Sequence, residues 1–212
     1  MPAVTISAGY GTGGSVVAQL VADSLGLPLL DRAISADVAA QLQVTVPEAE
    51  GASFSRSLTD RFFGLLTPLA SGVLGAGTDA APAEAATAPT DADLFRERAE
   101  QIMRDALTTG AVILGRAGGA AFRNEPGVLR ARLFGPKPAR IAHASRTQNI
   151  DLATAEKRLA QVDATRAQYV RRLYGVDIDD PALYHLQIDG TVLPETACAE
   201  LIVVAYAALL GN

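Results

Sequence analysis

Glycines and one hydroxyl residue gather near the amino terminus, where residues 4–15 read V-T-I-S-A-G-Y-G-T-G-G-S. A short β-branched strand therefore runs into a glycine-rich turn, and apolar residues at helical spacing follow within residues 16–21. Glycines let successive backbone N–H groups point inward, and a helix N-terminus adds about half a positive charge. The pattern predicts a phosphate-binding loop, in which the Ser15 hydroxyl would ligate Mg²⁺.

The loop lacks the usual cation. The standard sequence, G-x-x-x-x-G-K-[ST], has a lysine before the final hydroxyl residue. Aligning Ser15 with that hydroxyl places Gly14 at the lysine and Ala8 at the first glycine. A charge at about 4 Å contributes about 4 kcal/mol at an effective dielectric constant of 20, so an active phosphotransferase needs a substitute. Of the 18 basic residues only Lys137 and Lys157 are lysines, and we therefore expect an arginine.

Three arginines late in the chain are the leading candidates for this role: Arg166, Arg171 and Arg172. The planar guanidinium group suits bidentate contacts to phosphate. On one continuous helix the three do not form a single stripe, so their convergence over the site requires a broken helix or a helix that closes as a lid. The alternative is an ordinary solvated basic face. Asp163 lies three residues before Arg166, a helical spacing that would let it orient that arginine.

Charged residues also follow two predicted strands. Arg116 follows an apolar segment, and Asp31 and Arg32 follow another. Ligands of open α/β sheets bind at the carboxyl ends of strands, so we expect these three residues to bind the acceptor of a phosphoryl group. The alternatives are an ion pair between Arg116 and a carboxylate such as Glu100, and a structural pair at 31 and 32.

Strand-like and helix-like segments alternate along the chain, which predicts an α/β fold with a mostly parallel sheet. The expected strands are residues 4–7, 28–30, 111–115, 128–134 and 185–189. The expected helices are residues 14–25, 34–41, 93–108, 138–146, 151–173 and 195–210. Residues 75–90 are low in complexity and poor in large apolar side chains, and we predict a flexible loop there.

Composition limits the partners. A net charge of -5 and a pI near 5.0 argue against nucleic acid as a partner. The lone Cys198 excludes an internal disulfide and fits a reducing compartment. The absence of a charged leader or a long apolar segment indicates a cytoplasmic protein without a membrane partner. We expect Cys198 to be buried, and His143 and His185 to be structural. The Asp180-Pro181 pair is a helix-start or turn signal rather than part of a metal site.

Five segments together resemble the cytidylate kinase-like family of nucleoside monophosphate kinases, in particular a branch whose loop has no lysine. They are residues 5–15, 27–32, 112–118, 163–175 and 180–189. The resemblance implies a P-loop fold, a three-layer α/β sandwich with an inserted monophosphate-binding lobe and an arginine-bearing helical lid. It implies one domain over residues 1–212. The core would be 1–32, 93–148 and 176–212, the lobe 33–92 and the lid 149–175.

The resemblance further implies transfer of the ATP γ-phosphoryl group, with Mg²⁺, to CMP or dCMP. The partners would be small-molecule nucleotides, bound by a monomer or homodimer. The donor phosphates would lie on Gly11, Thr12, Gly13, Gly14 and Ser15. The chain departs from the cytidylate kinases proper where Ala117 replaces the aspartate after Gly-Arg, and where Asp31-Arg32-Ala33 replaces Asp-Thr-Gly or Asp-Ser-Gly. Both departures concern acceptor recognition.

Two other functions compete with this one. The first is a nucleotide-binding regulatory protein that kept the fold and lost turnover, which Gly14 and Ala117 suggest. The second is a dinucleotide-dependent oxidoreductase, because residues 9–14 also read G-x-G-x-x-G. Asp31 would then stand where such proteins place the acid that binds the ribose.

Overall fold

The computed structural model describes residues 3–30 and 91–211. The chain divides into two compact units, Met1–Arg32 with Ala99–Asn212, and Ala33–Arg98. Everything described below concerns the first unit, together with the helix that leads into it. The predicted helix at 34–41, nearly all of the predicted lobe, the predicted loop at 75–90, and Asp31 and Arg32 lie outside the described residues.

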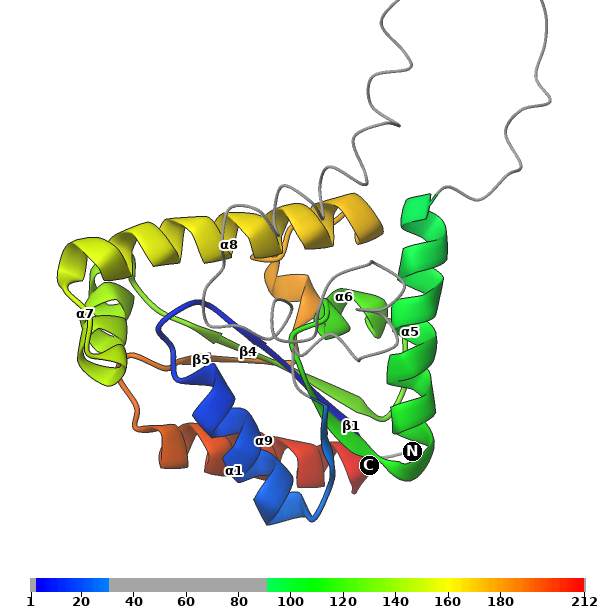
Figure 1. Ribbon diagram of the computed structural model, residues 1–212. Coiled ribbons are helices and arrows are strands. Elements are labelled where there is room, and N and C mark those ends of the chain that lie inside the picture. The colour runs from blue at the N-terminus through cyan, green and yellow to red at the C-terminus, as the bar shows by residue number, and fades with distance from the viewer. Residues whose placement is uncertain (1–2, 31–90, 212) are drawn as a thin grey trace, which may run out of the picture. The chain divides into compact units, whose positions relative to one another are not determined.

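Five described strands form one parallel sheet in the order β2-β3-β1-β4-β5 (Figure 1). The strands are β1 (Ala3–Ala8), β2 (Leu29–Leu30), β3 (Ala111–Leu114), β4 (Val128–Phe134) and β5 (Leu186–Asp189). The α/β class with a parallel sheet is therefore confirmed. Both edges of β1 are paired, with β3 and with β4. A dinucleotide-binding fold places its second strand beside its first, so this topology is not that of the oxidoreductase alternative.

The described helices follow the predicted ones closely. They are α1 (Gly14–Leu25), α5 (Asp91–Thr109), α6 (Gly118–Ala121), α7 (Lys137–Gln148), α8 (Leu152–Tyr174) and α9 (Glu195–Leu210), with a 3₁₀ turn η1 (Pro181–Leu183). The short helix α6 was not predicted. Asp180 caps η1 by accepting a hydrogen bond from the Ala182 amide, as its position before proline predicts.

One face of the sheet is apolar along its whole length. Because side chains alternate between faces, every second residue of β1 and β4 points to the same side. That side packs against α1 and α9, which lie together below the sheet in Figure 1. Its buried residues include Val4, Ile6, Leu114, Leu133 and Ile202. Cys198 belongs to the same cluster and is 1% exposed, as expected for a small apolar side chain, and its burial raises the pKa of the thiol.

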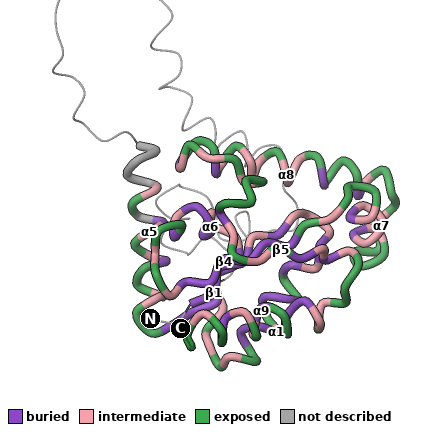
Figure 2. Tube along the Cα trace, turned by 180° about the vertical axis from the view of Figure 1, so that it is seen from behind, coloured by how far each residue is buried: buried purple, intermediate pink, exposed green. Residues whose placement is uncertain are grey.

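The opposite face changes character along the strands. At its amino-terminal end, Ala3, Ala111 and Val128 pack with Met103 of α5 and with Phe122. Toward the carboxyl ends, the buried residues on this face become polar, because Thr5, Arg130 and Arg132 occupy the next alternating positions. Figure 2 shows the strands as a buried core beneath helices with exposed outer surfaces. The sheet therefore has a polar layer under the side that carries α8.

Arg130 and His185 provide a pH-dependent contact in this layer. The Nδ1 atom of His185 accepts a hydrogen bond from the Arg130 amide at 3.3 Å. Partial burial of the ring and the Arg130 charge both lower the pKa of His185 below its usual value. At a pH between the lowered pKa and about 6.5, the unfolded histidine binds a proton that the folded one does not, so stability falls as the pH falls through this interval.

We expect the free energy of unfolding of the wild type to fall more steeply than that of His185→Asn between about pH 7 and about pH 5.5. Asparagine offers an oxygen acceptor and does not titrate. Urea denaturation at a series of pH values measures the difference, and comparing the two proteins cancels the other titrating groups. Parallel pH profiles would contradict the assignment.

Candidate functional site

The glycine-rich turn lies at the carboxyl end of β1 and leads directly into α1. Gly11 and Gly13 have φ angles of 76° and 72°, in the left-handed region that favours glycine. Both glycines also permit close contacts. A Cβ atom on Gly11 would lie 2.2 Å from the backbone oxygen of Arg140, and one on Gly13 would lie 2.9 Å from the Cγ atom of Glu195. Neither position accepts a side chain without displacement of its neighbours.

Among the described residues, the N-terminus of α1 has no side-chain cap. Gly13 is the N-cap residue, there is no side-chain hydrogen bond at the cap, and the first turn holds no acidic residue. The first helical bond runs from the Val17 amide to the Gly13 oxygen at 3.0 Å. The amides of the first turn precede this bond and can donate to an anion. Ser15 is exposed in the same turn. The geometry is that of an anion-binding helix start behind a glycine loop.

The side chain of Thr12 stabilises the conformation of the loop. This side chain is buried, and its Oγ1 atom donates to the Gly9 oxygen at 2.9 Å. The Thr12 hydroxyl therefore fixes the turn, and a donor-binding role at this predicted position would fall to its backbone.

Two charged residues of helix α8 contact the loop or the strand end before it. Helix α8 buries Ala155, Leu159, Val170 and Leu173, and this stripe faces the rest of the unit. Asp163 lies four residues after Leu159, and Arg166 lies four before Val170. Helical periodicity therefore places both charges on the buried stripe, where a leucine or valine would be ordinary.

Arg166 reaches the first position of the loop. Its Nη1 atom donates to the Ala8 oxygen at 2.7 Å. Arg171 and Arg172 are exposed, and Arg171 forms an ion pair with Asp177 at 3.7 Å with 74% of its side chain accessible. Since α8 is continuous from Leu152 to Tyr174, it does not break to bring the three arginines together. In this conformation only Arg166 of the three contacts the loop through a described hydrogen bond.

Asp163 and Arg140 hold Tyr10, two residues after Ala8. The Oδ1 atom of Asp163 accepts a hydrogen bond from the Tyr10 amide at 3.1 Å, and its Oδ2 atom lies 2.7 Å from Nη1 of Arg140. The same nitrogen donates to the Tyr10 oxygen at 3.2 Å. The expected role of Asp163 as the orienter of Arg166 stays a prediction. Arg140 was not predicted as a site residue, although its spacing from Ala144 puts it on the buried face of α7.

Arg116, just after β3, has a backbone conformation that is rare for a residue with a side chain. Gly115, Arg116 and Ala117 have φ angles of 79°, 51° and 55° in succession. Residues with a Cβ atom rarely adopt such angles, and when they do the strain often marks a functional position. Burial raises the pKa of Tyr169 to about 12, an effect that the charge of Arg116 opposes and that of Glu100 reinforces. Arg116 therefore lies within electrostatic reach of Tyr169, and both acceptor binding and an ion pair with Glu100 stay open.

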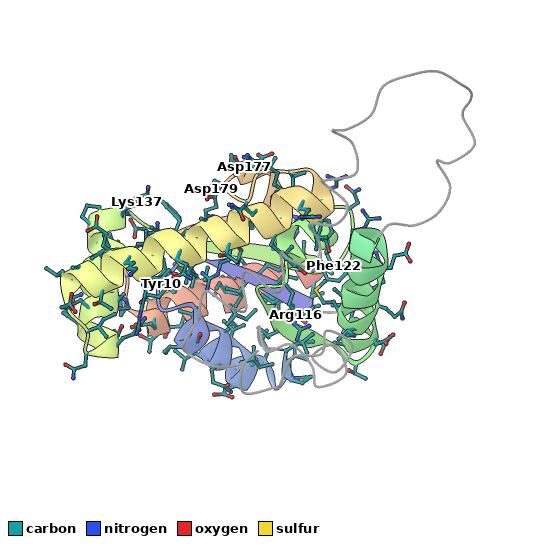
Figure 3. The ribbon with its side chains drawn as sticks, turned by 45° about the horizontal axis from the view of Figure 1, so that its top comes forward. Tyr10, Arg116, Phe122, Lys137, Asp177 and Asp179 are labelled. Atoms are coloured by element: carbon teal, nitrogen blue, oxygen red, sulfur yellow. The ribbon has the colours of Figure 1, made fainter. Side chains whose placement is uncertain are left out.

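Two buried arginines of β4 were not predicted from the sequence. Arg130 donates to the backbone oxygens of Leu183 and Phe122. Arg132 donates to Oγ of Ser7 at 3.1 Å, forms an ion pair with Asp179 and lies over the ring of Tyr184. The signal was present, because the strand reads V-L-R-A-R-L-F with both arginines on one face. These contacts attach the segment after α8 to the sheet (Figure 3 labels Asp179).

The described residues contain no cluster of three or more histidine, cysteine, aspartate or glutamate side chains that could hold a metal ion. Asp177, Asp179 and Asp180 are used in an ion pair with Arg171, an ion pair with Arg132 and the cap of η1, respectively. Within residues 3–30 and 91–211, no helix has both the length and the apolar character required to cross a bilayer.

A five-stranded parallel sheet with a glycine loop between its first strand and first helix defines a P-loop α/β protein. The model of the cytidylate kinase-like family matches residues 3–191, and the chain belongs to this family. The comparison with curated proteins gives no matching sequence.

Among solved structures, an uncharacterized protein from Eubacterium ventriosum is similar with a TM-score of 0.60 and 15% identity, over 98% of both chains. This similarity supports the fold alone. A gluconokinase from Sinorhizobium meliloti has a TM-score of 0.49 and 13% identity, over 98% of this chain and 93% of that one. A shikimate kinase from Bacteroides thetaiotaomicron has a TM-score of 0.48 and 11% identity, over 100% and 99%.

The close approach at Gly11 can be separated from the strain of a left-handed backbone. Gly26 has a φ of 63°, and a Cβ atom there would meet nothing within 4 Å. We expect Gly26→Ala to lower the free energy of unfolding by about 1–2 kcal/mol, the cost of the left-handed conformation. Gly11→Ala adds overlap with the Arg140 backbone and should lower it by clearly more.

Urea denaturation measures both free energies, and calorimetric titration with ATP measures the effect on the loop. Nucleotide affinity should fall about tenfold or more in Gly11→Ala and stay unchanged in Gly26→Ala, because only the first substitution displaces the anion-binding turn. Equal effects of the two substitutions would show that α7 does not pack on the loop as described.

Proposed function

We propose that this protein is a kinase that transfers the γ-phosphoryl group of ATP to a nucleoside monophosphate, with CMP or dCMP as the acceptor. Membership of the cytidylate kinase-like family supports phosphoryl transfer as the class of chemistry. One observation carries the proposal further. The lysine-free glycine loop has a guanidinium group at its first residue, because Arg166 contacts the Ala8 oxygen at 2.7 Å.

In this proposal the donor phosphates lie on the amides of residues 11–15, and the start of α1 adds the positive end of its dipole. Arg166 supplies the charge that the lysine of a standard loop would supply. Its long side chain reaches the loop from α8, whereas a lysine would reach it from the loop's own helix. The substitution of Gly14 for lysine is thereby compensated from a distant part of the chain.

The residues at the start of α1 fit a magnesium ion. Mg²⁺ prefers oxygen ligands and usually keeps several waters, with substrate phosphates completing its shell. An exposed Ser15 hydroxyl beside the phosphate-binding amides matches that donor set, and no cage of protein carboxylates is needed. When bound, the ion would neutralise charge on the donor phosphates.

The transfer itself requires positioning and charge rather than a covalent intermediate on the protein. A phosphate oxygen of the acceptor bonds to the γ-phosphorus, the bond from this phosphorus to the bridging oxygen breaks, and ADP and a nucleoside diphosphate leave. Arg116 is proposed to hold the acceptor phosphate, and Asp31 and Arg32 are proposed to bind the acceptor monophosphate with it. Arg171 and Arg172 are exposed and would contribute only if α8 moved over the bound nucleotides.

A second function, nucleotide binding without turnover, is favoured by Gly14 and by Ala117, which replaces an acidic residue at the end of β3. A coupled kinase assay over a panel of monophosphates, combined with thermal unfolding in the presence of nucleotides, separates the two functions. Bound ATP at 100 times its Kd stabilises the folded protein by about 2.7 kcal/mol, which raises the Tm by several degrees.

Turnover with CMP or dCMP is the expected result. Stabilisation by ATP without turnover on any monophosphate would favour the regulatory protein. An unchanged Tm with every nucleotide, with or without Mg²⁺, would reject both functions.

Alanine substitutions should rank the three arginines of α8. Arg166→Ala is expected to lower kcat by about 10³-fold, because it removes the charge that compensates for the absent lysine, and to change ATP affinity only a few-fold. Arg171→Ala and Arg172→Ala should cause smaller losses, since both side chains are exposed.

Lys157→Ala is the matched control, because it removes an exposed positive charge from the same helix. Its rate should equal that of the wild type in steady-state kinetics. A rate for Arg166→Ala similar to that of Lys157→Ala would remove Arg166 from the mechanism.

A further inference from the structure

Tyr10 is bound at each of its three polar groups. Its amide donates to Asp163 at 3.1 Å, and its backbone oxygen accepts from Arg140 at 3.2 Å. Its hydroxyl donates to the Oε1 atom of Gln148 at 2.7 Å. The three partners come from α7 and α8, although Tyr10 lies more than 120 residues earlier in the chain. Figure 3 labels Tyr10 beside these helices.

The contacts of Asp163 and Arg140 with the Tyr10 backbone are partly buried, whereas the contact of the Tyr10 hydroxyl with Gln148 is exposed. Arg140 is 8% exposed, and its Nη1 atom is held by Asp163 and by the Tyr10 oxygen, so this guanidinium group is fixed beside the loop. Its Nη1 atom lies 2.6 Å from the place of a Cβ atom on Gly9. The ion pair with Asp163 is partly buried, where a hydrogen-bonded pair of charges is stronger than one on the surface.

The negatively charged Asp163 side chain lies beside a loop that we propose to bind an anion. Its carboxylate accepts from a loop amide as a phosphate oxygen would, and its negative charge would repel the phosphates of a donor. Arg140 offsets that charge at 2.7 Å. Asp163, Arg140 and Arg166 together carry one net positive charge, and the Glu195 carboxylate lies beside the loop at Gly13.

We propose that Asp163 and Arg140 are positioning residues that hold the glycine loop in its phosphate-binding conformation before a nucleotide arrives. They act through the peptide groups on either side of Tyr10, and they fix the loop to the helix that carries Arg166. The inference rests on the proposed function, which supplies the donor. A loop ordered in advance loses less conformational freedom when its ligand binds, so the effect of the pair is on donor binding more than on the chemical step.

The experiment uses the full chain with Asp163→Ala, Asp163→Asn and, as a matched control, Glu156→Ala, which removes an exposed carboxylate from the same helix. Hydrogen exchange of residues 9–15 is followed in the nucleotide-free protein, and the KM for ATP and kcat are measured separately. Thermal unfolding verifies that each variant is folded.

For Asp163→Ala we expect the Tyr10 amide to exchange at least ~10-fold faster, and the KM for ATP to rise ~10- to 100-fold with kcat changed only a few-fold, as for loss of a charged hydrogen bond. Asp163→Asn keeps an oxygen for the Tyr10 amide and should restore part of the protection. Glu156→Ala should match the wild type.

Wild-type exchange rates in Asp163→Ala would overturn the proposal, and so would a loss confined to kcat. Failure of the wild type to bind any nucleotide would reject the proposed function. The exchange rates would still decide whether Asp163 orders the loop.

Discussion

Arg140 approaches the backbone of the glycine loop so closely that a methyl group at Gly9 or Gly11 would overlap with it. The side chain meets the loop at Gly9, and the carbonyl group meets it at Gly11. Glycine is therefore needed here for contact as much as for conformation. Because α7 touches the loop directly, the polar groups of α7 and α8 can bind Tyr10, and Arg166 can reach Ala8. The loop and these two helices are therefore held together by direct contacts.

A P-loop usually carries its own cation. In this chain the loop has no lysine, and the substitute that we propose, Arg166, comes from α8, which is continuous and packed by its apolar stripe, so its charge is placed by tertiary contacts. An arginine held in this way has a fixed direction, and its planar group can donate to a backbone oxygen and a phosphate together. Asp163 offsets the charge of Arg140 beside the same loop, which lessens the repulsion between Arg140 and Arg166.

Away from the loop, the polar layer of the sheet also contains arginines that are held by tertiary contacts. Arg130 and Arg132 are buried, and both have partners in the segment that follows α8 or near it. Buried charges are stable in a protein only when they are paired or hydrogen-bonded. These contacts therefore fix where the chain returns from α8 to β5, and with it the orientation of the helix that presents Arg166.

Hydrophobic periodicity by itself determined most of the fold. The predicted bounds of 14–25, 128–134 and 195–210 agree with α1, β4 and α9, because local alternation and helical spacing decide those elements. The loop and its missing lysine were also readable in the residues. Which arginines turn inward was decided only by tertiary structure. Arg140 and Arg166 face the interior because packing assigns one side of each helix to the core, whereas the equally basic Arg171 and Arg172 fall on the solvent side of α8.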